Sequence, residues 1–408
     1  MNKLLTALLF ALAISSCNNA SKDSAKEKAE PIQTTNLKEL QSPADTASAE
    51  PYLFTDKNGL VYLSWIEKKM GTSFLKVSTF TNEQWSQPMI ISSGDNWFVN
   101  WADYPLVAAD GANNLIAHYL EKSEQGKYTY DVKITTSGDA GKTWGIAKVL
   151  HNDGKKAEHG FVSMIPYGDN YFVSWLDGRN SVMEEDGGHS EGHHGQMTIR
   201  GAVIDKQGNK SNEWELDNRV CDCCQTAAAI TENGPVVVYR DRSEQEIRDM
   251  SIVRLIDGKW TTPKPIFADN WKIEGCPVNG PRIDAIGNSM AVAWFTSPDK
   301  NAQVNIVFSK DGGATFNSPL RIDEGKGIGR VDVVMLDENT AVVSWMEGSV
   351  IKAVKAYNNG KKEPSFIVAA SAESRSSGFP QMTKSGTNLI FSWTDDKSKS
   401  IKVASFSL

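Results

Sequence analysis

The stretch RVCDCCQTA, residues 219–227, holds three of the five cysteines in a chain of 408 residues. These are Cys221, Cys223 and Cys224, and a fourth, Cys276, lies in the stretch EGCPVNGPRI. Clustered thiols form disulfides, bind soft metal ions or act as redox groups. A disulfide between the adjacent Cys223 and Cys224 would close a strained ring. A disulfide from Cys276 to one member of the cluster would instead join distant parts of the chain.

Histidines near the cysteines in sequence widen the choice of chemistry. His159 lies in the stretch EHGF, and His189, His193 and His194 lie in the glycine-rich stretch DGRNSVMEEDGGHSEGHHGQM. Thiolate and imidazole ligands together favour copper(I) or zinc. Cys-x-Cys-Cys is not a standard zinc spacing. Metal binding, disulfide bonding and a redox-active thiol therefore remain alternatives, and with disulfides no cofactor is expected.

The N-terminus indicates an exported protein, in which disulfides are common. Lys3 is followed by the apolar run LLTALLFALAI, which is too short to span a bilayer and is typical of a secretory signal. The sequence ISSC before and at Cys17 resembles the lipoprotein box of bacteria. This resemblance implies that residues 1–17 are a signal peptide and that Cys17 carries lipid. Asn18 after the cysteine implies, by the same resemblance, an anchor at the outer membrane.

The rest of the chain has the composition of a large folded domain. Residues 18–35 are polar and predict a flexible tether. The whole chain is 40% hydrophobic with 12 tryptophans, which argues against disorder. A net charge of −7 without a basic run argues against nucleic acid as a partner. No segment after residue 17 is apolar and long enough to cross a membrane, and the sequence gives no indication of oligomeric state.

The elements that must position these residues are predicted by a repeat. Seven short apolar runs end in an aromatic residue, and successive aromatic residues lie 54, 56, 64, 55, 51 and 48 positions apart. The aromatic residues are Trp65, Tyr119, Trp175, Tyr239, Trp294, Trp345 and Trp393. A period near 50 made of β-type runs is typical of a β-propeller with one four-stranded sheet per repeat. We therefore predict an all-β, seven-bladed propeller over residues 36–408, with six blades as the alternative.

The ends of the chain predict how the ring closes. The seventh repeat stops after its third strand, IKVASFSL, at the C-terminus. The segment TNLKELQ near residues 35–41 would supply the missing strand. The same single domain would then begin and end in one blade.

Two turns of the predicted propeller carry a sharper motif. The segments SGDAGKTW and SKDGGATF match Ser-x-Asp-x-Gly-x-x-aromatic. This pattern resembles the Asp-box, or BNR repeat, of the sialidase-like propellers, and in it Asp bonds its own turn, Gly takes a positive φ and the aromatic side chain packs over the blade. Its residues, which we expect to be structural, are Ser137, Asp139, Gly141, Trp144, Ser309, Asp311, Gly313 and Phe316.

The resemblance to sialidases does not extend to their arginine motif. Sialidases bind the substrate carboxylate with three arginines, one of them from an Arg-Ile-Pro motif. Here the first arginine is Arg179, and Arg-Ile-Pro does not occur. Standard sialidase activity is therefore not expected. The later arginines at predicted strand ends would form either an anionic pocket or ion pairs with nearby acids; they are Arg240, Arg242, Arg282 and Arg330.

Propeller geometry gathers the chemistry at one mouth of the channel. The connections that open the third, fourth and fifth repeats carry His159 and the four cysteines, and the connection into the second repeat carries Trp97 and Asp103. We predict that this mouth binds or processes a small-molecule or glycan ligand, and that a Cys/His metal or redox centre does so.

Two alternatives come from other function classes. In an exo-acting glycoside hydrolase, Tyr239 would be the nucleophile and Asp241 or Asp177 the acid/base, and Arg240, Arg282 and Arg330 would hold an anionic group. In a non-catalytic binding scaffold, the mouth would have neither a metal nor convergent acids.

Overall fold

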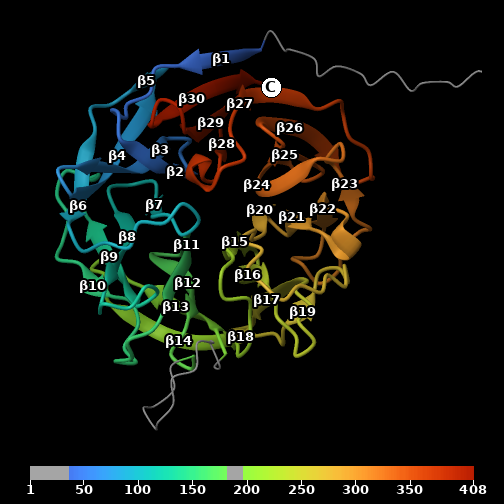
Figure 1. Cartoon of the computed structure of the whole chain (residues 1–408), viewed down its shortest axis with the longest axis horizontal. Helices are drawn as coiled ribbons and strands as arrows, with labels where there is room; N and C mark the ends of the chain where they lie inside the picture. Colours follow the sequence, from blue (N-terminus) through green and yellow to red (C-terminus); the bar gives the residue numbers. More distant parts are fainter. Residues whose placement is uncertain (1–35, 182–195) are drawn as a thin grey trace, which may run out of the picture. The chain divides into compact units, whose positions relative to one another are not determined.

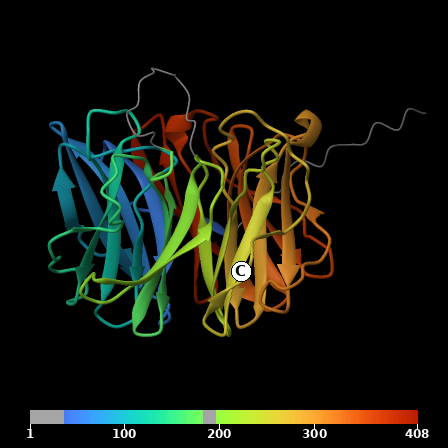
Figure 2. The same ribbon diagram turned by 90° about the horizontal axis from the view of Figure 1, so that it is seen from below.

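The computed structural model describes residues 36–181 and 196–408. Seven antiparallel sheets surround a central axis, so the predicted seven-bladed propeller is confirmed (Figure 1). Figure 2 shows the ring from its edge, with strands running between its two faces. The predicted signal, lipidation site Cys17, tether 18–35 and His189, His193 and His194 lie outside the described residues.

The first four blades follow the chain in order. Blade 1 consists of β2 (Ser48–Thr55), β3 (Val61–Lys69), β4 (Thr72–Thr81), β5 (Gln84–Trp85) and β6 (Met89–Gly94). Blade 2 consists of β7 (Val107–Ala109), β8 (Leu115–Lys122), β9 (Tyr130–Ser137) and β10 (Lys148–Val149). Blade 3 consists of β11 (His159–Tyr167), β12 (Asn170–Asp177), β13 (Thr198–Ile204) and β14 (Lys210–Asp217). Blade 4 consists of β15 (Ala227–Thr231), β16 (Gly234–Arg240), β17 (Met250–Ile256), β18 (Lys259–Trp260) and β19 (Lys264–Pro265).

The remaining blades complete the ring. Blade 5 consists of β20 (Arg282–Ile286), β21 (Ser289–Thr296), β22 (Gln303–Ser309) and β23 (Leu320–Arg321). Blade 6 consists of β24 (Gly327–Asp337), β25 (Thr340–Glu347), β26 (Val350–Tyr357) and β27 (Phe366–Ala370). Blade 7 consists of β28 (Gln381–Ser385), β29 (Asn388–Asp395), β30 (Ser400–Ser407) and β1 (Leu37–Leu40). The 3-10 turns are η1 (Pro298–Lys300) and η2 (Arg375–Ser377), and no helix of the described residues is long and apolar enough to span a membrane.

Blade 7 is closed by both ends of the described chain, as predicted. β1 pairs antiparallel with β30, with Leu37 opposite Phe406 and Leu40 opposite Val403. Figure 1 shows β1 as the outermost strand beside β30. The pairing covers the edge that β30 would otherwise expose, and exposed edges invite pairing with other chains.

The repeating aromatic residues form the blade cores. Trp175 and Trp345 are fully buried. The indole Nε1 of Trp175 donates to Asp177 at 2.8 Å, and that of Trp345 donates to Glu347 at 2.6 Å. The acid two positions after the aromatic residue therefore satisfies a buried indole N–H, which otherwise costs free energy.

The turns at residues 137–144 and 309–316 have matching hydrogen bonds. Asp139 accepts from the Ser137 hydroxyl at 2.8 Å and from the Thr143 amide at 2.9 Å. Gly141 has a φ of +85°, which favours glycine, and the Trp144 indole donates to its carbonyl at 3.1 Å. Asp311 accepts in the same way from Ser309 and Thr315. Both carboxylates thus bond within their own turns.

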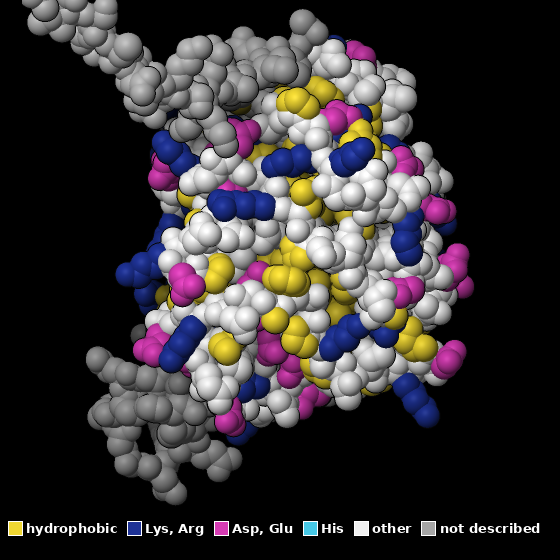
Figure 3. All heavy atoms as spheres, turned by 90° about the vertical axis from the view of Figure 1, so that its right-hand side faces the viewer, with side chains coloured by type: hydrophobic (Ala, Val, Ile, Leu, Met, Phe, Trp, Pro, Cys, Tyr) yellow, Lys and Arg dark blue, Asp and Glu magenta, His cyan; other side chains and the backbone are white. Residues whose placement is uncertain are grey.

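Charged side chains of both signs are scattered over the side of the ring that Figure 3 shows. Figure 3 shows lysines and arginines interspersed with acids and with hydrophobic side chains on one side of the molecule. This mixture gives that surface no single charge sign.

Candidate functional site

The central channel contains a cavity of about 450 Å³ lined by the first strands of the blades. This volume lies within the usual range for small-molecule sites. At one end the lining residues Lys57 and Gly386, in the turns after β2 and β28, are exposed. At the other end Ala102, Phe161 and Gln225 are buried. The cavity therefore opens on the face that carries the turns after the first strands.

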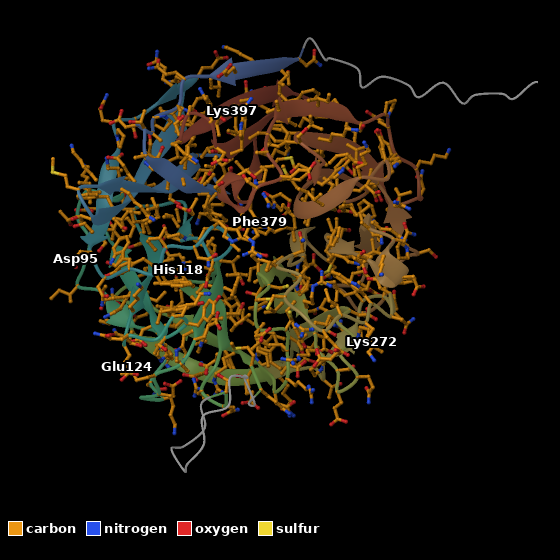
Figure 4. All side chains as sticks on the ribbon, in the orientation of Figure 1. Asp95, His118, Glu124, Lys272, Phe379 and Lys397 are labelled. Carbon is orange, nitrogen blue, oxygen red and sulfur yellow. The ribbon has the colours of Figure 1, made fainter. Side chains whose placement is uncertain are left out.

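The opposite end, where the sequence analysis placed the mouth, is closed by cross-channel contacts. The Gln225 side chain donates to the Ala102 carbonyl at 2.6 Å and accepts from the Gly280 amide at 2.9 Å. Trp101 and Phe379 stack with ring centroids 5.6 Å apart. Figure 4 labels Phe379 near the centre of the ring. The predicted position of the ligand mouth is corrected accordingly, because these side chains fill it.

Arg282 is the charged centre of the channel. Its Nη2 donates to the Tyr104 hydroxyl and, at 3.0 Å, to the Gln381 amide oxygen. Its Nε lies 3.8 Å from Asp332 Oδ1. These side chains come from blades 5, 2, 7 and 6, so the channel walls meet at this guanidinium. The Arg282 side chain is 15% exposed, because the residues around the channel enclose it.

Burial determines the protonation of this cluster. It raises the pKa of Tyr104, and the positive charge of Arg282 only partly opposes it. Burial also raises the pKa of Asp332, again opposed by Arg282. Asp332 accepts the backbone amides of Met382 at 2.7 Å and Val333 at 2.9 Å, so its oxygens already have partners besides Arg282. The raised pKa means that the Tyr104 hydroxyl holds its proton more tightly than a free tyrosine does.

A second acidic group borders the closed end. The Tyr130 hydroxyl donates to Glu158 at 2.8 Å and lies 3.3 Å from Asp103 Oδ2. Asp103 Oδ1 accepts the Phe161 amide at 2.8 Å. Burial raises the pKa of Asp103 to about 7 and that of Glu158 to about 8. Groups that titrate near neutrality are suited to proton transfer.

The four cysteines of the described chain come together, as the sequence analysis expected. Cys221 Sγ lies 3.7 Å from Cys223 Sγ and 3.6 Å from Cys224 Sγ. The sulfurs of Cys223 and Cys276 lie within 4.8 Å of each other. All four are thiols rather than disulfides in this structure. Such a grouping has the donor set of a soft-metal site.

His159 does not join the cysteines. Its ring stacks on His151 at a centroid distance of 3.5 Å, and its Nε2 lies 2.8 Å from Asp153. Arg179 pairs with Asp177 at 2.7 Å and with Asp153 at 3.3 Å. His159 shares its groups of possible metal ligands with aspartates and His151, and no such group in the described residues contains both a cysteine and a histidine. The predicted mixed Cys/His set is therefore corrected to a set of cysteines within the described residues.

The predicted hydrolase residues do not converge. Tyr239 is 1% exposed, and its hydroxyl donates to Asp217 at 2.6 Å. It occupies the blade-core position of the repeating aromatic residues. Asp241 accepts from Ser251 at 3.2 Å, and Asp177 is bound by Arg179. The assignment of Tyr239 as nucleophile is therefore corrected to a packing role.

The predicted arginine clamp also separates. Arg240 donates to the carbonyls of Asn279, Arg248 and Phe295. Arg330 donates to Ser377 and Gly378, and burial lowers its pKa to about 10. Only Arg282 of the three lines the cavity.

Two further predicted ligand contacts lie elsewhere. Arg242 pairs with Glu246 at 2.8 Å. Trp97 stacks on Tyr119 at 4.3 Å inside blade 2. Of the three predicted ligand residues Arg242, Trp97 and Asp103, only Asp103 lines the cavity.

Asp332 is one of the nearby acids with which the arginines were expected to pair, and Tyr104 follows Asp103 in the sequence. The other partners of Arg282 and Asp103 were not predicted; they are Tyr52, Tyr130, Glu158 and Gln381. A signal was present in the first strands, where four repeats place a polar or aromatic side chain at the channel: Tyr52, Arg282, Asp332 and Gln381. Aligning these strands by their inward positions would have found the cluster.

Comparisons with known proteins identify the fold. No family model matches the chain, and no curated protein matches its sequence. A structure of an ulvan lyase of polysaccharide lyase family PL25 matches with a TM-score of 0.56 at 11% identity, over 90% of this chain and 95% of that one. The polysaccharide lyase Uly1 matches with a TM-score of 0.53 at 8% identity, over 88% and 90%.

A sialidase is also among the similar structures. The Hadza microbial sialidase Hz136 matches with a TM-score of 0.41 at 15% identity. The match covers 73% of this chain and 63% of that sialidase, so this chain spans less than two thirds of its length. At these identities the comparisons establish a shared propeller fold, and a fold alone does not assign an activity.

Proposed function

We propose that the protein binds an acidic saccharide in the channel cavity, with Arg282 pairing with a carboxylate of the sugar. The observation that carries the proposal is the position of the Arg282 guanidinium at the cavity, beside the Tyr104 hydroxyl and the Gln381 amide. A planar guanidinium pairs with a carboxylate through two parallel hydrogen bonds. Hydroxyl and amide groups beside it would bond the sugar hydroxyls.

Aromatic side chains support a saccharide as the ligand. The rings of Tyr52 and Tyr104 stack with centroids 6.3 Å apart beside Arg282. Aromatic rings offer apolar faces on which sugar rings pack. The ulvan lyase of the same fold was solved bound to -[GlcA(1-4)Rha3S]-, a segment that contains glucuronic acid. That likeness concerns the fold, and Arg282 is what extends it to an acidic ligand here.

Calorimetric titration of the full chain tests this proposal. The probe is an oligosaccharide that contains glucuronic acid, and its matched control is the same oligosaccharide with the carboxyl groups reduced to alcohols. We expect binding of the acidic form only, weakened at least about tenfold by Arg282→Gln because a charge-assisted pair is lost. Arg321→Gln, which removes a rim arginine paired with Asp323, is the control variant.

Two results would contradict the proposal. Equal affinity for the acidic and the reduced oligosaccharide would show that no carboxylate is recognised. Unchanged affinity in Arg282→Gln would place the site outside the channel. If new reducing ends appear in the same samples, the protein cleaves the saccharide as well as binding it.

We further propose that lipid on Cys17 anchors the propeller at the outer membrane. The support is the order of the N-terminal segment: charge, short apolar run, small residues and cysteine. Growth with a labelled fatty acid should label the full chain and leave Cys17→Ser unlabelled. Label retained by Cys17→Ser would refute the anchor.

A further inference from the structure

The four cysteines of the described chain come from two connections between blades. Cys221, Cys223 and Cys224 lie between β14 and β15, where blade 3 leads into blade 4. Cys276 lies between β19 and β20, where blade 4 leads into blade 5. Cys221 and Cys224 are buried, whereas Cys276 is exposed. The cluster lies at the closed end of the channel, so it is separate from the saccharide site proposed above.

The sulfur–sulfur distances match metal ligation better than a disulfide. A disulfide bond is about 2.05 Å long. Four sulfurs around a tetrahedral ion at about 2.3 Å lie about 3.8 Å apart along each edge of the tetrahedron. Cys221 Sγ lies 3.7 Å and 3.6 Å from the sulfurs of Cys223 and Cys224. Cys223 also belongs to a second group, in which its sulfur, the Cys276 sulfur and an Asp222 carboxylate oxygen lie within 4.8 Å of one another. Cys223 thus links Cys276 to the other two cysteines.

We propose that Cys221, Cys223, Cys224 and Cys276 together bind one thiophilic metal ion, zinc(II) or copper(I). Each thiol loses its proton to solvent as its sulfur bonds the metal, so up to four protons leave per ion. No electrons are transferred, and no oxidant or reductant is needed. Four protein ligands leave no open position, which is typical of a structural site.

Buried positive charge beside the cluster supports an anionic centre there. Four thiolates around zinc(II) carry a net charge of −2. Arg248 Nη1 lies 3.1 Å from Cys221 Sγ, although Arg248 also pairs with Glu246 at 2.8 Å. Groups that donate to metal-bound sulfur from outside stabilise the site.

Arg240 supplies a second positive charge that otherwise lacks an explanation. Its side chain is 1% exposed, bonds three carbonyl oxygens and lies over the ring of Trp271. It forms no ion pair with any acid within residues 36–181 and 196–408. Burying an unpaired charge is costly. The Cys221 amide donates to the Arg240 carbonyl at 3.0 Å, so Arg240 is the backbone neighbour of the cluster.

Metal binding would fasten the connection that opens blade 4 to the connection that opens blade 5. That connection also contains Gly280, whose amide bonds the Gln225 side chain that closes the channel. A Cβ on Gly280 would lie 2.1 Å from the Gln225 carbonyl oxygen, so the two connections are in close contact. The metal would thereby hold the closed end of the channel in place.

Metal analysis of the full chain, purified in detergent without chelator, tests the proposal. Elemental mass spectrometry should find about one zinc or copper ion per chain and identify which it is. Cys276→Ser should lower the content at least about tenfold, because it removes one of four ligands. Cys17→Ser makes the same substitution outside the cluster and should retain the ion.

A second readout separates loss of ligation from loss of folding. Cys276 is exposed, so its replacement should leave the cooperative thermal unfolding of the propeller in place even if Cys221→Ser fails to fold. After exchange of the metal for cobalt(II), the wild-type protein should show thiolate charge-transfer absorption that Cys276→Ser weakens. An unaltered cobalt spectrum in Cys276→Ser would overturn the assignment of that ligand.

Two further outcomes would overturn the whole proposal. One is a purified protein without metal whose intact mass and peptide map show disulfides among the four cysteines. The other is a metal-free protein in which all four thiols react with an alkylating reagent and which takes up neither zinc(II) nor copper(I) afterwards.

Discussion

Asp103 links the burial of one side chain to the pH behaviour of the protein. Its carboxyl group accepts one backbone amide and lies beside the Tyr130 hydroxyl, but it has no cationic partner in the described part of the chain. Gly160 lies against the same carboxyl group, since a Cβ there would be 2.1 Å from Asp103 Oδ2. Asp103 therefore holds a proton more readily because it is buried, and its carboxyl group fits only because position 160 is a glycine.

The raised pKa of Asp103 predicts that stability falls as the pH rises. The pKa is about 7 in the folded protein against 3.8 for an unperturbed aspartate. The folded state therefore binds a proton that the unfolded state lacks between these values. The resulting stabilisation, up to about 4 kcal/mol, is complete below the lower pKa and is lost as the pH rises through the higher one.

Urea unfolding between these two pKa values checks this prediction. Asp103→Asn has no carboxyl proton to lose, so its free energy of unfolding should depend less on pH than that of the wild-type protein. The same fall in both proteins would mean that another group causes it.

Gly160→Ala should destabilise the protein by about 1–3 kcal/mol because the new Cβ displaces the Asp103 carboxyl group from the Phe161 amide. Gly138→Ala is the control, since a Cβ there meets only Asn114 Oδ1, at 3.9 Å. Denaturant midpoints of both variants measure the difference. A Gly160→Ala midpoint equal to that of Gly138→Ala would show that the carboxyl group moves at no cost.

At the scale of elements, the strands were predictable because each blade repeats the same packing. An aromatic residue near the end of the second strand of each blade fills the space within and between blades. At Trp175 and Trp345 the acid two positions later accepts the indole N–H. Such positions recur once per blade and leave a period in the sequence. Tyr239 belongs to this series, and its place in the series was stronger information than its resemblance to a nucleophile.

The turns at residues 137–144 and 309–316 carry a prediction at this scale. Asp139→Ala removes the acceptor of three hydrogen bonds, from Ser137, the Thr143 amide and the Thr143 hydroxyl. We expect a lower free energy of unfolding, because three hydrogen bonds of the turn are lost, with saccharide affinity unchanged. Asp169→Ala, which removes a fully exposed carboxylate, should leave the denaturant midpoint unchanged. Loss of saccharide affinity in a folded Asp139→Ala would contradict a purely structural turn.

At the scale of the whole molecule, ring closure depends on a short strand. β1 has only four residues, yet it covers the outer edge of blade 7 through its pairing with β30. Leu37 packs against the core cluster of blades 6 and 7, and Leu40 against that of blades 7 and 1. The strand therefore contributes to two blade interfaces.

Removing this strand should weaken the entire ring. A chain that starts at residue 42 lacks β1, whereas one that starts at residue 36 keeps it and is the control. We expect a lower melting temperature for the shorter chain and self-association through the exposed edge of β30. Calorimetry and sedimentation measure the two effects. Equal melting temperatures would show that the ring does not need closure by β1.

The candidate site was less predictable than the ring because it depends on contacts between side chains of different blades across the channel. Arg282 and Tyr104 are 178 residues apart and come from different blades. Non-periodic positions leave no repeat to detect. The cysteines were an exception, since their chemistry marks them without any knowledge of the fold. Their separation from His159 was not predictable, because sequence alone does not show that His159 pairs with Asp153 and stacks on His151.

The closure of one channel end by Gln225 gives the molecule a direction. A channel open at both ends would let a polymer thread through and be read at internal units. A channel closed at one end admits a molecule only through its open end, and the molecule must leave through the same end. Under the proposed function, a long saccharide would reach Arg282 only with a terminal unit or a branch, so the number of chain ends in a sample, rather than its mass, would set how much ligand the protein encounters.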